Sequence, residues 1–180
     1  MRALTLVLAL LFTANTVHAD IAWQVDRFGP GSLMVMKDRS GAMTHVARGT
    51  EGNLHVFDVY DGTGGSADFV GRYKTTARGD VVETVAFDGA VTRFVPNRCN
   101  RTEGTCRFTM IHPDGFAEPR TRVTRATRAG LRYREFGLDG LMAEGALELD
   151  GNGAAKAGWT TDAPNEERKL RVRRGLVALK

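Results

Sequence analysis

Short runs in which apolar and polar side chains alternate, separated by glycine-containing turns, fill most of this 180-residue chain. A period of two is typical of strands that bury one face, because successive side chains point to opposite sides of a sheet. Asp88-Gly89 separates two such runs, and glycine accepts the positive φ that a tight hairpin turn requires. The pattern therefore predicts consecutive antiparallel hairpins.

The alternation predicts strands over residues 32–37, 42–48, 53–60, 67–75, 80–87, 90–95, 105–112, 120–128, 131–136, 140–149, 154–160 and 168–174. On the fourth strand, Phe69, Gly71 and Tyr73 are expected on the inward face. A sustained 3.6-residue period is missing, and one helical turn is expected at most, over residues 165–169. We expect an all-β antiparallel meander of about 10–12 strands with little helix, which closes into a barrel or folds as a sandwich.

The first nineteen residues have the features of a secretory signal peptide. Arg2 supplies a positive start, residues 3–12 are apolar apart from Thr5, and a small-residue cleavage pattern ends at Ala19. The apolar stretch is too short to span a bilayer. We therefore expect a signal peptide over residues 1–19, followed by a single all-β domain over residues 20–180. The mature protein is expected to be periplasmic or secreted, without a transmembrane segment.

The charge of the expected mature domain is close to balanced. The chain has 25 Lys and Arg and 21 Asp and Glu, and Arg2 is the one charged residue within the signal, so the net charge falls from +4 to +3. This charge is small for a nucleic-acid-binding protein. No nucleic-acid partner is expected.

Two cysteines, Cys99 and Cys106, enclose six polar or small residues. Export to an oxidising compartment favours a disulfide between them. A redox-active pair usually has two intervening residues at the start of a helix, and two cysteines fill only half of a tetrahedral zinc site. The spacing therefore predicts a structural disulfide that closes a hairpin, and no cofactor is expected.

Six arginines lie between residues 120 and 134 with no acidic residue among them, and Lys169, Arg171 and Arg173 alternate with apolar residues further on. Alternation places such residues on one face of a strand, and the planar guanidinium suits bidentate binding to phosphate or carboxylate. A solvated strand face is the alternative interpretation. The candidate ligand-binding residues are Arg120, Arg122, Arg132, Arg134, Arg171 and Arg173. The expected partner is an anionic envelope component or a small hydrophobic ligand.

A second candidate site contains soft metal ligands, Met34, Met36, Met43 and His45. If Lys37 pairs with Ala42, these four side chains lie on one face of two neighbouring strands. Thioether and imidazole groups suit Cu(I). Alternatively, the methionines fill a core, and a slip of one residue in register would separate the group.

The glycine-rich segment from Asp58 to Asp68 is a third candidate, because Ser66, His55 and Asp58 would supply the groups of a hydrolase. No serine lies in a nucleophile-elbow motif, and a hairpin loop explains the composition better. We therefore expect an exported binding or envelope-associated module rather than an enzyme, which recognises an anionic ligand through its arginine-bearing strands. A periplasmic copper-binding protein and a hydrolase are the alternatives.

Overall fold

A computed structural model describes residues 28–38, 42–63, 67–99, 103–149, 155–162 and 166–176, and the expected signal peptide lies outside them. Within these residues the chain forms strands and no helix. The strands are β1 (Ser32–Asp38), β2 (Ala42–Glu51), β3 (Leu54–Asp61), β4 (Asp68–Thr75), β5 (Val81–Ala86), β6 (Val91–Arg98), β7 (Gly104–Ile111), β8 (Ala117–Thr127), β9 (Gly130–Gly137), β10 (Gly140–Leu149), β11 (Ala155–Asp162) and β12 (Glu166–Leu176). A helix long and apolar enough to cross a membrane is absent from the described part of the chain.

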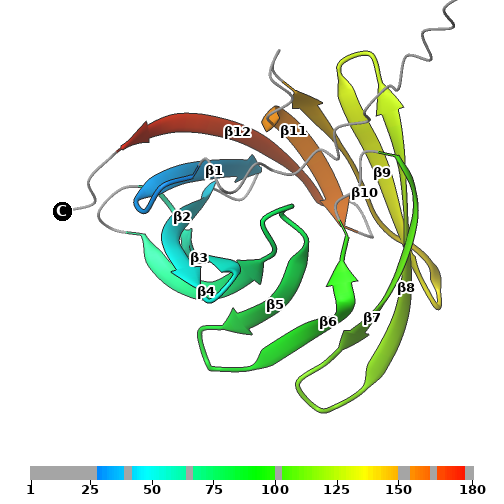
Figure 1. Cartoon of the computed structure of the whole chain (residues 1–180). Coiled ribbons are helices and arrows are strands. Elements are labelled where there is room, and N and C mark those ends of the chain that lie inside the picture. The colour runs from blue at the N-terminus through cyan, green and yellow to red at the C-terminus, as the bar shows by residue number, and fades with distance from the viewer. Residues whose placement is uncertain are drawn as a thin grey trace, which may run out of the picture.

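Each strand pairs antiparallel with its neighbours in the chain, and β1 also pairs with β12. The pairing of β1 with β12 runs from Ser32 opposite Leu176 to Asp38 opposite Arg168. The sheet therefore closes into a barrel, and the strands follow one another around a ring in chain order (Figure 1). The predicted all-β meander is confirmed, and closure makes it a barrel rather than a sandwich.

Two local expectations were wrong. The predicted helical turn is replaced by the start of β12, because residues 166–169 pair with β11. Phe69 is 45% exposed rather than inward, and its ring contacts Tyr60. The register of β3 with β4 shifts between Val59 and Tyr60, which inserts an extra residue in β4 and reverses the alternation beyond it.

Strand β9 shows which face of the sheet is inside the barrel. Leu131, Tyr133 and Glu135 are 1%, 9% and 5% exposed. Between them, the side chains of Arg132 and Arg134 are 51% and 56% exposed. Because alternate side chains point to opposite faces, the buried set faces inward and the arginines of β9 face solvent. The inner face therefore carries a charged carboxylate beside leucine and tyrosine.

The disulfide belongs to an apolar cluster on this inner face. Cys99 and Cys106 are bonded, with their Cα atoms 6.3 Å apart. Cys99 packs with Phe94 and Phe108, and Met110 lies against the same cluster. The predicted pairing of the two cysteines is confirmed, and the bond joins the end of β6 to β7.

Removing this bond should lower the free energy of unfolding by about 2.5 kcal/mol, the chain-entropy value for a closed loop of about eight residues. The variant is Cys99→Ala combined with Cys106→Ala, and urea denaturation measures the loss. Wild-type protein in reducing buffer should lose a similar amount. Equal midpoints for oxidised and reduced wild type would contradict a stabilising role for the bond.

Candidate functional site

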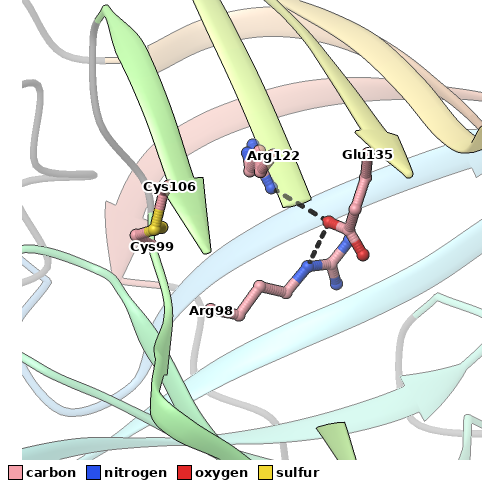
Figure 2. Close-up of a disulfide and its surroundings, with 5 residues drawn as sticks. All are labelled: Arg98, Cys99, Cys106, Arg122 and Glu135. Atoms are coloured by element: carbon pink, nitrogen blue, oxygen red, sulfur yellow. Dashed lines mark hydrogen bonds and ion pairs between the residues drawn. A yellow bond between two sulfur atoms is a disulfide. The ribbon is translucent and has the colours of Figure 1, made fainter. Parts of the chain in front are cut away.

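Three charged side chains meet on the inner face beside the disulfide (Figure 2). Arg98 comes from the end of β6, Arg122 from β8 and Glu135 from β9. Arg98 Nε donates a hydrogen bond of 2.9 Å to Glu135 Oε2, and Arg122 Nη1 lies 3.8 Å from the same oxygen. We call these three residues the inner charge cluster. Its two guanidinium groups share one carboxylate oxygen.

Register explains why these residues meet. On one side, Arg122 lies directly opposite Glu135 of β9. On its other side, Arg122 lies opposite Cys106 of β7. Arg98 is 37 residues from Glu135 in sequence and belongs to a strand that does not pair with β9. Its long side chain therefore reaches Glu135 across the curved inner face, as Figure 2 shows.

Arg122 is the more deeply buried of the two arginines of the cluster. It is 8% exposed, and its guanidinium carbon lies 3.7 Å from the centre of the Tyr133 ring. Its Nε has no hydrogen-bond partner among the described residues. Burial, together with the positive charge of Arg98, lowers the pKa of Arg122 to about 10, while Tyr133, Glu135 and Asp80 favour its charged form. The group therefore stays protonated at neutral pH, with an unsatisfied buried donor.

A second ion pair lies two residues along β8. Arg120 Nη2 donates to Glu118 Oε2 at 2.8 Å, and His112 Nε2 lies 3.1 Å from the same oxygen. The hydrogen bond from Arg120 lowers the pKa of Glu118 against the opposing effect of burial, and His112 adds to the lowering. The Nε of Arg120 also lacks a hydrogen-bond partner within the described part of the chain. Two buried, unpaired arginine donors therefore project from β8.

The structure brings together only part of the predicted arginine set. Arg120 and Arg122 lie on the inner face, whereas Arg132 and Arg134 lie outside and pair with Glu144 at 3.5 Å and 3.1 Å. Arg171 and Arg173 belong to β12, where the structure describes the backbone, and Arg171 stands opposite Val35 in the register. The sequence did not identify Arg98 or Glu135. The sequence feature that could have directed attention to this cluster is the position of Arg98 directly before Cys99.

The predicted methionine and histidine face has the expected register. Lys37 pairs with Ala42, so Met34 stands opposite His45 and Met36 opposite Met43. His45 Nδ1 lies 3.2 Å from the hydroxyl of Tyr73, while its buried Nε2 has no hydrogen-bond partner in the described part of the chain. Burial lowers the pKa of His45 to about 4, so the imidazole is neutral at neutral pH. The side chain of Met36 lies outside the described part.

The aspartate of the predicted hydrolase site is engaged elsewhere. Asp58 accepts hydrogen bonds of 2.7 Å from Arg48 Nε and from Arg72 Nε, and we call these three residues the outer charge trio. Burial opposes ionisation of Asp58, but the hydrogen bonds from Arg72 and Arg48 outweigh it and lower its pKa. Ser66 lies outside the described residues. The Asp58 carboxylate thus bonds to arginines rather than to His55.

Gly145 makes room for the ring on which Arg122 stacks. A Cβ atom at this position would lie 2.6 Å from the backbone oxygen of Trp159 and 2.7 Å from the Oη of Tyr133. Gly145→Ala should therefore lower the free energy of unfolding by about 1–3 kcal/mol, the usual cost of overpacking. Gly29→Ala is the control, because a Cβ there would meet no atom within 4 Å. Equal urea midpoints for the two variants would contradict the close approach of Tyr133.

No family model, curated protein or solved structure matches this chain.

Proposed function

We propose that this protein is an exported binding protein whose inner charge cluster binds the carboxylate group of a small organic anion. The observation that carries the proposal is Arg122, a charged guanidinium that is 8% exposed and has an unpaired Nε. An unpaired buried donor costs about 1–3 kcal/mol, and more when the group is charged. A bound carboxylate removes that cost, because its oxygens accept hydrogen bonds from a guanidinium in matching planar geometry.

The surroundings of Arg122 support a ligand with an apolar part. Cys106 lies opposite Arg122 on β7, and Phe108 lies opposite Arg120. These residues belong to the apolar cluster that contains the disulfide. The Arg98 side chain is 32% exposed, so solvent reaches this end of the cluster. An amphipathic carboxylate would place its charged end on Arg122 and its apolar chain against the cluster.

Calorimetric titration with sodium octanoate, acetate and phosphate tests the proposal at fixed ionic strength. We expect octanoate to bind with one site per chain, more tightly than acetate and phosphate. Arg122→Gln should weaken octanoate binding at least tenfold, whereas Arg134→Gln should leave it unchanged, because Arg134 faces outward. Equal weakening by both variants would point to non-specific surface charge and overturn the proposal. So would the absence of octanoate binding to wild type.

Circular dichroism of each variant separates loss of binding from loss of folding. If Arg122→Gln is unfolded, Arg122→Lys serves in its place, because it keeps the charge and loses the planar fork. A folded Arg122→Lys protein with wild-type affinity would contradict bidentate recognition by this residue.

A further inference from the structure

We propose that Met34, Met43 and His45, on the inner faces of β1 and β2, form a binding site for Cu(I). The proposal is independent of the carboxylate site, which lies on β6, β8 and β9. Met34 stands directly opposite His45, and Met43 lies two residues before His45 on the same face of β2. Opposite residues of an antiparallel pair have Cβ atoms about 4.5–5.5 Å apart. The register therefore places these three residues side by side on one face of the barrel wall.

The imidazole of His45 is held in the manner of a metal ligand. Its ring packs edge-on against the ring of Tyr73, with 5.5 Å between ring centroids and an interplanar angle of 69°. Nδ1 is engaged by the Tyr73 hydroxyl at 3.2 Å, which leaves Nε2 buried and without a hydrogen-bond partner in the described part of the chain. A ligating histidine usually has its second ring nitrogen hydrogen-bonded, because that bond fixes the ring orientation. Tyr73 is itself fixed by stacking on Phe57 at an interplanar angle of 9°.

The chemistry of the donors selects the metal. Thioether sulfur and neutral imidazole are soft donors, which favour Cu(I) over the hard cations that carboxylates bind. Met34 is buried at 6% exposure, and methionine's three rotatable bonds allow its sulfur to turn toward a shared ion.

Anaerobic competition with a chromophoric Cu(I) chelator tests this site, with ascorbate present to hold the metal as Cu(I). We expect one Cu(I) per chain, and a loss of affinity of at least tenfold in each of Met34→Leu and Met43→Leu. Leucine nearly conserves the side-chain volume, so both variants should fold. Met110→Leu is the matched control, because Met110 is an inner-face methionine packed against Phe94 and Phe108. Equal losses in all three variants would overturn the proposal.

Ag(I), a redox-inert analogue of Cu(I), gives a second readout on wild-type protein. In methyl NMR spectra, the Met34 and Met43 resonances should shift on addition of one equivalent of Ag(I), while that of Met110 stays in place. No displacement of chelator-bound Cu(I), or Ag(I) shifts at Met110 alone, would rule out a soft-metal site here. Octanoate binding would be unaffected by either result.

Discussion

Replacing Glu135 by Gln should lower the free energy of unfolding by about 3–5 kcal/mol, the usual cost of removing one partner from a buried ion pair. The change removes the carboxylate that Arg98 and Arg122 share, and leaves two guanidinium groups facing each other inside the barrel. Glutamine nearly keeps the volume of glutamate, so the loss reports charge rather than packing. Urea denaturation of both proteins at pH 7 measures it.

The outer charge trio is a matched control for this prediction. It also contains one carboxylate between two guanidinium groups, but the side chains of Arg48 and Arg72 are 43% and 39% exposed. Water can solvate both groups after Asp58→Asn, so the expected loss is about 0.5–2 kcal/mol, the sum for two ion pairs with exposed cations. A loss from Asp58→Asn as large as that from Glu135→Gln would contradict the argument that burial sets the cost of the inner charges.

Acidification from pH 7.5 to pH 4 should remove about 3 kcal/mol of unfolding free energy through His45 alone. Burial lowers the pKa of its imidazole from 6.5 to about 4, so between these values the unfolded chain binds the proton and the folded protein does not. The neutral imidazole of His45 therefore makes its full contribution to the free energy of unfolding above pH 6.5. This contribution is lost as the pH falls toward 4. Each pKa unit corresponds to about 1.4 kcal/mol.

The measurement compares wild type with His45→Gln, whose side chain does not titrate. The difference in unfolding free energy between the two proteins should change by about 3 kcal/mol between pH 7.5 and pH 4. Titration of the His45 ring followed by NMR supplies the folded-state pKa directly. A constant difference, or a folded-state pKa near 6.5, would contradict the buried environment described for this side chain.

Period-two alternation was enough to predict the antiparallel strands and, to within one residue, most of their bounds. The register of β1 with β2 was a condition in the prediction of the metal site, and the structure has the register in which Lys37 pairs with Ala42 and Met34 and His45 share a face. The sequence did not predict whether the sheet closes into a barrel or folds as a sandwich. Whether β1 meets β12 depends on twist and curvature summed over the intervening strands, which no single residue encodes.

The same limit explains why the sequence did not separate the inward-facing arginine residues from the outward-facing ones. All six between residues 120 and 134 look alike in sequence, but inward positions are even-numbered on β8 and odd-numbered on β9, since Arg122 pairs with Glu135. The hairpin between β8 and β9 sets this change from even-numbered to odd-numbered inward positions. Arg122 therefore points inward, whereas Arg132 points outward. Arg98 was missed because its partner lies 37 residues away. A contact across the inner face follows from barrel curvature, whereas sequence patterns report neighbours along a strand.

The most direct test of the carboxylate site is the side-chain Nε–H resonance of Arg122 in a ¹H–¹⁵N spectrum of wild-type protein. During titration with sodium octanoate, this resonance should move downfield and saturate at one equivalent, because the unpaired Nε gains an acceptor. The Nε–H of Arg134, on the outer face, should stay in place. An Arg122 resonance that does not respond while octanoate binds elsewhere would contradict the account.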